Sequence, residues 1–119
     1  MVVTMQGLEA VAANTTVQNV LTGVRYERSP FTAALGALYS CGSAAGLTAE
    51  LNVGGQSVTP PTNVNTQNRY PVVPDDVLVS QWEVLEGRLI QVTVVNTTGG
   101  ALNFFWRVDL EEADVQVVG

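Results

Sequence analysis

The spacing of apolar residues between positions 77 and 110 predicts three consecutive β-strands. In the last of these segments every second residue is apolar: Leu102, Phe104, Trp106, Val108 and Leu110. A period of two places these side chains on one face of a strand, whereas a helix would scatter them over several faces. Residues 77–85 and 88–95 are also rich in the β-branched and aromatic residues that favour strands, and glycine-containing turns separate the three segments. We therefore expect a sheet with one buried face.

The remainder of the chain carries shorter signals of the same kind. Residues 47–53 alternate cleanly, and Gly54-Gly55 after them is a hairpin signal. Residues 14–27 predict one or two strands. Ser29-Pro30 resembles the start of a short helix, but we favour a strand in the residues that follow, from 36 to 41. About seven or eight strands, with turns at intervals of about ten residues, are typical of an antiparallel β-sandwich.

The length of the chain, 119 residues, predicts one domain. We predict an all-β fold, a single antiparallel β-sandwich over residues 14–119, which is jelly-roll-like because a jelly roll has about eight strands. An immunoglobulin-like sandwich, with about seven strands, is the alternative. Residues 1–13 carry no capping signal, and we predict an N-terminal arm or edge segment there. This segment, the proline-started loop at residues 60–68 and the tail at residues 115–119 are expected to reach neighbouring subunits.

Charged residues are scarce in this sequence. They make up 13% of the chain, against about 25% in a typical soluble domain, and all five cations are arginine. A small monomer normally covers its surface with mixed charges, so we infer that neighbouring subunits hide part of the surface. The alternative is a monomer whose surface is covered by the many Thr, Asn, Gln and Gly residues.

The net charge of −6 argues against direct binding of nucleic acid, because phosphates repel an acidic protein without basic clusters. No apolar stretch reaches the roughly 20 residues that a membrane helix needs, so we expect no membrane contact. The first residues also lack the basic start and the long apolar region of a signal peptide. We therefore expect synthesis in a cytoplasm.

The sequence offers few residues for catalysis or metal binding. It has no histidine and a single cysteine, Cys41, which excludes histidine-based triads and zinc–thiolate sites, and we predict that Cys41 is buried. Carboxylates remain at the predicted strand ends, namely Asp75, Asp76, Glu111, Glu112 and Asp114. We interpret them as solvated charges rather than as a glycosidase pair or a calcium site. We predict that the protein is not an enzyme and binds no cofactor or metal.

Aromatic residues indicate where other subunits would make contact. Trp82 and Trp106 alternate in phase with the apolar residues of their predicted strands, so they fall on the buried face. We predict that both lie in the core. Phe105 falls on the opposite face, where an aromatic side chain is exposed unless a partner covers it. Phe105 is therefore the first candidate for a subunit contact, and the further candidates are Phe31, Arg69 and Tyr70.

Several segments resemble small β-sandwich virion proteins of bacteriophages. They are residues 44–55 (AAGLTAELNVGG), 68–76 (NRYPVVPDD), 86–89 (EGRL), 95–98 (VNTT) and 105–108 (FWRV). These segments are mainly turn and strand patterns, and the resemblance covers most of the chain from Asn14 onwards. Similar patterns occur in secreted adhesion and carbohydrate-binding domains. No catalytic or ligand-binding residue carries over from the resemblance.

The resemblance implies a structural role. We expect a capsid decoration (cement) or minor capsid protein at the capsid surface of a phage virion, made in the host cytoplasm. Its partners would be the major capsid protein and other virion proteins. We also expect a homo-oligomer, a trimer or a pentamer. The alternative function is a glycan- or receptor-binding module of a phage fibre or spike.

Overall fold

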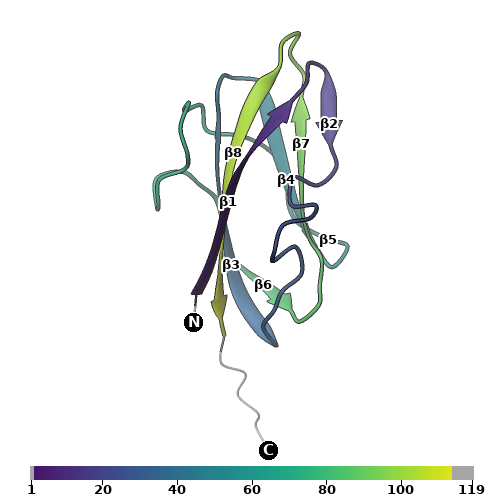
Figure 1. Cartoon of the computed structure of the whole chain (residues 1–119), viewed down its shortest axis with the longest axis vertical. Coiled ribbons are helices and arrows are strands. Elements are labelled where there is room, and N and C mark those ends of the chain that lie inside the picture. Colours follow the sequence, from purple (N-terminus) through teal and green to yellow (C-terminus); the bar gives the residue numbers. More distant parts are fainter. Residues whose placement is uncertain (1, 114–119) are drawn as a thin grey trace, which may run out of the picture.

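The computed structural model of the chain describes residues 2–113, and β-strands are its regular elements (Figure 1). Eight strands occur in this part of the chain: β1 (Val2–Val11), β2 (Thr15–Val17), β3 (Ala33–Gly42), β4 (Leu47–Val53), β5 (Gln56–Asn63), β6 (Val77–Leu85), β7 (Ile90–Asn96) and β8 (Leu102–Glu112). No helix is present among these residues, and hence none that is long and apolar enough to cross a membrane. Asp114 and the tail at residues 115–119, whose roles were predicted above, lie outside the described residues.

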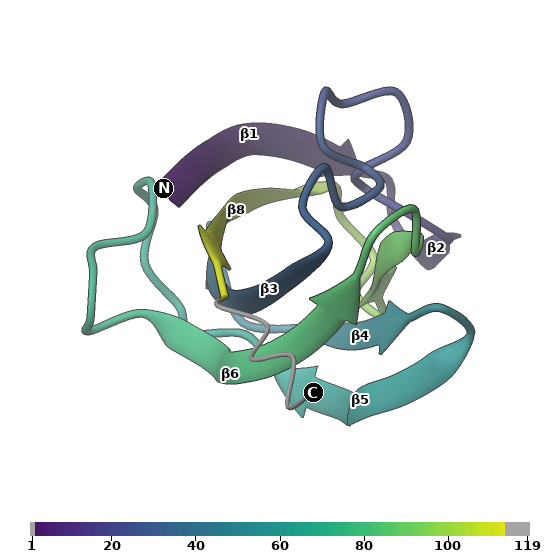
Figure 2. The same ribbon diagram turned by 90° about the horizontal axis from the view of Figure 1, so that it is seen from below.

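The strands form two antiparallel sheets with the orders β1-β8-β3-β6 and β2-β7-β4-β5. The two sheets curve around a shared core, as the view along the long axis shows (Figure 2). Pairing joins β1 to β8, β2 to β7, β3 to β6 and β4 to β5, so the chain is a long hairpin rolled up on itself. This is the eight-stranded jelly-roll arrangement, which confirms the predicted sandwich. An immunoglobulin-like sandwich would instead divide about seven strands between its sheets.

The core lies between the inner faces of the two sheets and follows the predicted alternation. Trp82 and Trp106 are each only 4% exposed, which confirms their predicted core positions. Each indole ring lies against a glycine of the neighbouring strand, Trp82 against Gly36 and Trp106 against Gly7. A Cβ atom at Gly36 would lie 2.4 Å from the ring atoms Cη2 and Cζ2 of Trp82. Glycine at this position therefore makes room for the indole.

The N-terminal segment of the chain is an edge strand of the sandwich. β1 pairs with β8 in one unbroken register over all ten of its residues. In the segment 14–27, by contrast, only Thr15–Val17 form a strand. The chain beyond it is a loop whose buried side chains Val20, Leu21 and Phe31 belong to the core. Of the two alternatives predicted for this segment, one strand or two, the structure has the first, because the loop contributes to the core without pairing as a strand.

The helix suggested by Ser29-Pro30 does not form. Ser29 is buried, and its hydroxyl exchanges hydrogen bonds of 3.3 Å with the backbone N–H and C=O of Phe31. This local turn uses the serine that would otherwise cap a helix. β3 then runs from Ala33 to Gly42, which confirms the strand predicted over residues 36–41 but begins three residues earlier.

β5 continues through Pro60 and Pro61 as far as Asn63, so the predicted start of an irregular loop at residue 60 is wrong. Two consecutive prolines are tolerated because β5 is an edge strand and its register with β4 shifts twice. The connection between β5 and β6 therefore comprises residues 64–76.

Candidate interaction surface

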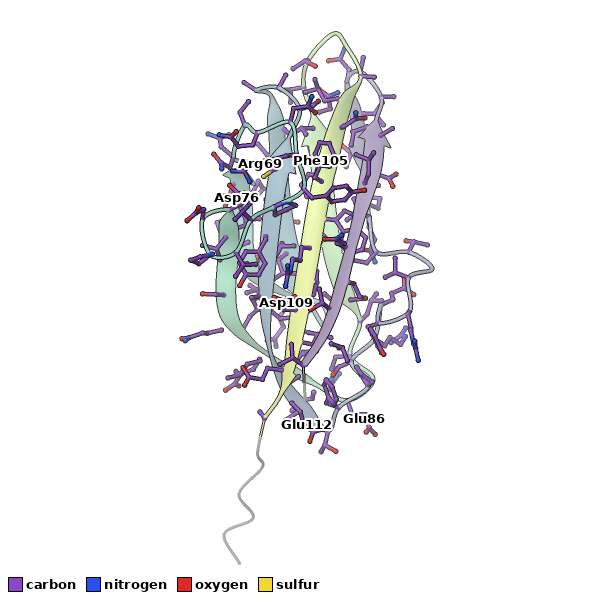
Figure 3. The ribbon with its side chains drawn as sticks, turned by 60° about the vertical axis from the view of Figure 1, so that its left-hand side comes forward. Arg69, Asp76, Glu86, Phe105, Asp109 and Glu112 are labelled. Carbon is purple, nitrogen blue, oxygen red and sulfur yellow. The ribbon has the colours of Figure 1, made fainter. Side chains whose placement is uncertain are left out.

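The connection at residues 64–76 lies against β3 and is called the anchored loop below. In Figure 3 it lies over β3, on the face of the sheet that carries Phe105. Near one end, the backbone N–H of Gly42 donates to the carbonyl oxygen of Asn65 at 2.8 Å. At the other end, the backbone N–H of Ser40 donates to the carbonyl oxygen of Asp76 at 3.0 Å. Both ends of the loop are thus fixed to the same strand.

Asp76 is the centre of this attachment. It is 2% exposed, and its carboxylate accepts hydrogen bonds from Asn65 Nδ2 (2.5 Å), Arg69 Nη1 (2.6 Å) and the backbone N–H of Val72 (2.8 Å). The thiol of Cys41, on β3, also hydrogen-bonds to it. The expectation that Asp76 is a solvated charge is therefore wrong. Because Arg69 already balances its charge, this carboxylate is a poor ligand for calcium.

The pKa values of the two buried titratable groups suit a structural anchor. Burial alone would raise the pKa of Asp76, but hydrogen bonds from Val72, Cys41, Asn65 and Arg69 outweigh burial and lower the pKa below its usual value. Burial raises the pKa of the Cys41 thiol to about 11, and the neighbouring Asp76 adds to this effect. At neutral pH the carboxylate is charged and the thiol is protonated, so Cys41 is a poor nucleophile. Cys41 is fully buried, as predicted.

Phe105 lies on the outer face of its sheet, as the parity predicted, but it is only 8% exposed. The ring of Tyr70 covers it in an edge-to-face contact, with ring centroids 5.2 Å apart and planes inclined by 72°. Tyr70 itself is 46% exposed, and Leu8, opposite Phe105 on β1, is 48% exposed. The exposed aromatic side chain predicted at Phe105 is therefore found at Tyr70, which covers Phe105.

Four exposed apolar residues lie within one short stretch at the end of the anchored loop. They are Tyr70, Val72 and Val73 of the loop and Val77, the first residue of β6, each between 42% and 46% exposed, and they are called the apolar loop residues below. Exposed apolar groups that lie together commonly mark interaction sites. Sequence reasoning singled out Tyr70 alone, because valines in a strand-rich chain are usually taken as core residues. A stretch of valines flanked by prolines was the available signal that this segment could not join a sheet interior.

The other predicted contact residues have different surroundings. Phe31 is 8% exposed and packs in the core, so it offers little surface to a partner. The side chain of Arg69 is 41% exposed even though it pairs with Asp76. The structure thus brings Arg69, Tyr70 and Phe105 together at the anchored loop, whereas Phe31 lies in the core. Their role as subunit contacts stays a prediction.

Two shallow hollows border β3. One, of about 320 Å³, lies beside Gly36 and Ala37, where β6 bulges and Gln81 has a positive φ of 60°. The other, of about 520 Å³, opens between β5 and β6, and its polar lining consists mainly of hydroxyl and amide side chains: Ser40, Thr62, Asn63, Asn65 and Thr66. The Ser40 hydroxyl is buried, and no described residue hydrogen-bonds to it. Within residues 2–113, no group of three His, Cys, Asp or Glu side chains could hold a metal ion.

No protein-family model and no curated protein matches this sequence. The jelly roll occurs in viral capsid proteins, lectins and cupins, so the fold alone does not select a function. The anchored loop and the composition of the chain therefore carry the functional argument.

Proposed function

We propose that the protein is a structural subunit of a bacteriophage virion, a capsid decoration or minor capsid protein that binds neighbouring virion proteins through the anchored loop. The observation that carries this proposal is the set of exposed apolar loop residues, which the ion pair between Arg69 and the buried Asp76 holds in place. The jelly roll supports it, because viral capsid proteins commonly have this fold. The low charge content of 13% also supports a chain that is partly covered by other proteins.

A fixed loop favours binding because little conformational entropy is lost when a partner docks on it. Asp76 holds both Arg69 and the backbone of Val72, and Tyr70 rests on the ring of Phe105. The exposed side chains of the loop are therefore in place before a partner arrives. Tyrosine and arginine at the centre of such a surface are typical interface hot spots. Binding would bury apolar surface and would need no covalent chemistry.

Co-sedimentation with capsids, assembled from the major capsid protein of the same phage, tests the proposal. We expect the wild-type chain to pellet with the capsids and the V72S/V73S variant to stay in the supernatant. Serine removes exposed apolar surface there and leaves the Asp76 carboxylate unchanged. The matched control is V58S, because Val58 is 37% exposed on β5, in the other sheet. Equal pelleting of all three proteins, or no pelleting of the wild type, would contradict the proposal.

A glycan- or receptor-binding module of a phage fibre is the second candidate, and the hollow between β5 and β6 favours it. Its hydroxyl and amide side chains, those of Thr62, Asn63, Asn65 and Thr66, are suited to sugar hydroxyls. Trp82 is buried in the core and cannot stack on a sugar from there. Binding to a glycan array that is lost in the T62V variant, with an unchanged circular-dichroism spectrum, would favour this role.

A further inference from the structure

Sheet edges can pair with strands of another chain, and most edges of this protein carry features that prevent such pairing. β5 contains Pro60 and Pro61, and its register with β4 shifts twice. β6 is also irregular, because its register with β3 shifts twice and Gln81 has a positive φ of 60°. β2 is only three residues long. Among the four edge strands described, only β1 lacks such a feature.

β1 is a long and regular edge strand. It pairs with β8 without a register shift, contains no proline, and carries Glu9 as its one charged residue. Apart from the pairing with β8, no hydrogen bond from a described residue reaches the backbone of residues 2–10. Figure 3 shows β1 at the margin of the sheet, beside β8. Alternate N–H and C=O groups on its far side are therefore available to a further antiparallel strand.

We propose that β1 pairs with β1 of a second copy of the chain, antiparallel, about a two-fold axis beside Met5. The pairing joins two four-stranded sheets into one continuous sheet. In this register Val2 lies opposite Leu8 of the partner subunit, and Thr4 lies opposite Gln6 of the partner subunit. Val2 is 56% exposed and Leu8 is 48% exposed in the single chain. The two exposed apolar side chains of the strand thus cover each other at both ends of the pair.

The side chains on both faces of β1 select this register. Opposite residues on antiparallel strands share a face, and apolar pairs stabilise the sheet whereas like charges destabilise it. A shift of the pairing by two residues would place Leu8 opposite Thr4 and Glu9 opposite Val3, so that apolar side chains meet polar ones. A larger shift would bring the two Glu9 carboxylates opposite each other. The proposed register instead keeps the Glu9 residues at opposite ends of the pair.

This pairing goes beyond the proposed function, because it uses an edge of the sandwich and not the anchored loop. A two-fold contact of this kind is complete with two copies. It does not by itself produce the trimer or pentamer expected from the sequence, which would need a further contact elsewhere on the surface. The dimer would exist whether or not a capsid is bound.

Light scattering coupled to size-exclusion chromatography tests the pairing. We expect the wild-type chain to elute as a dimer and the V2K/L8K variant to associate at least about tenfold more weakly and elute as a monomer. The matched control is L85K, because Leu85 is 56% exposed on β6, the bulged edge of the same sheet. The control should remain a dimer. A wild-type monomer at every accessible concentration, or a dimer that survives V2K/L8K, would overturn the proposal.

Thiol cross-linking tests the register itself. In a C41S background, the V2C/L8C variant places a thiol opposite a thiol at two points of the dimer, so mild oxidation should yield a covalent dimer on a non-reducing gel. L8C alone faces Val2 of the partner subunit and should not cross-link. Equal cross-linking of both variants would overturn the register. Capsid co-sedimentation separates the two proposals, since a dimer that fails to pellet contradicts only the proposed function, and a monomer that pellets contradicts only the pairing.

Discussion

Replacing Asp76 by asparagine should release the anchored loop, and the structure sets the size of the effect. Besides the hydrogen bond from the Cys41 thiol, the carboxylate accepts three from nitrogen atoms, at 2.5, 2.6 and 2.8 Å, and one of these comes from the guanidinium of Arg69. Asparagine keeps the shape of the side chain but loses the charge, and its amide nitrogen would face at least one donor. A lost charge-assisted hydrogen bond costs about 1.5–3 kcal/mol, and an unpaired buried donor about 1–3 kcal/mol. Because the Arg69 side chain is 41% exposed, water replaces part of the loss, so we expect the free energy of unfolding to fall by about 2–4 kcal/mol.

Urea denaturation followed by tryptophan fluorescence measures this change, because Trp82 and Trp106 both lie in the core. D75N is the matched control: Asp75 is the exposed neighbour, and its replacement should change the free energy of unfolding by less than about 0.5 kcal/mol. Hydrogen exchange reports on the loop directly. The backbone N–H of Val72 donates to the Asp76 carboxylate at 2.8 Å and should exchange faster in D76N.

Two results would refute this reasoning. A loss below about 1 kcal/mol with unchanged exchange at Val72 would mean that Asp76 does not hold the loop. A large loss of stability with a loop amide as protected as in the wild type would mean that Asp76 supports the core instead. In either case contacts other than those of Asp76 would hold the loop, and the proposed role of Asp76 in fixing the binding surface would lose its physical basis.

Glycine packing, acid sensitivity and thiol reactivity offer further tests. Gly36→Ala should lower the free energy of unfolding by about 1–3 kcal/mol, because its Cβ would lie 2.4 Å from the Trp82 ring. Gly99→Ala, with nothing within 4 Å, should change it little, and equal losses in urea denaturation would contradict this account. Because the folded-state pKa of Asp76 is lowered, its stabilising contribution is complete above the unfolded pKa of about 3.9 and is lost as the pH falls through the folded value. Urea midpoints should therefore drop below about pH 4 in the wild type and less steeply in D76N; parallel curves would argue against this role. The buried Cys41 thiol, with its pKa raised to about 11, should react slowly with iodoacetamide and faster in D76N, as mass spectrometry would show.

The fold class could be predicted from the sequence because its signal is local. The period of two in residues 102–110 fixes which side chains are buried, and Trp106 lies in the core as expected. The Gly54-Gly55 turn likewise marks the hairpin between β4 and β5. The jelly-roll order depends instead on which strands pair, and the number of strands was the only sequence signal that favoured it over an immunoglobulin-like sandwich.

The anchored loop could not be predicted, because its two ends are fixed to β3, a strand that is distant from the loop in the sequence. Asp76 follows another aspartate and two prolines, a context typical of a solvated turn. Only the fold brings Cys41 of β3 to this carboxylate. The same reason explains why Phe105 is less exposed than predicted. Its position in the strand correctly placed it on the outer face of the sheet, but the ring of Tyr70 that covers it comes from the loop.

The contacts that the arginines make within the chain determine which forces can hold a partner. Four of the five make internal contacts: Arg69 and Arg107 in ion pairs, Arg25 over the ring of Tyr26 and Arg28 with the carbonyl oxygen of Gly87. Arg69, the one cation of the anchored loop, is paired with Asp76, so binding through this loop depends on apolar burial. Salt screens exposed charges beyond a Debye length of about 8 Å at physiological ionic strength, but it does not weaken apolar burial. We therefore expect capsid co-sedimentation to be as strong at about 0.5 M NaCl as at about 0.05 M. Release of the protein at high salt would indicate a charged contact, and would place the binding surface away from the apolar loop residues.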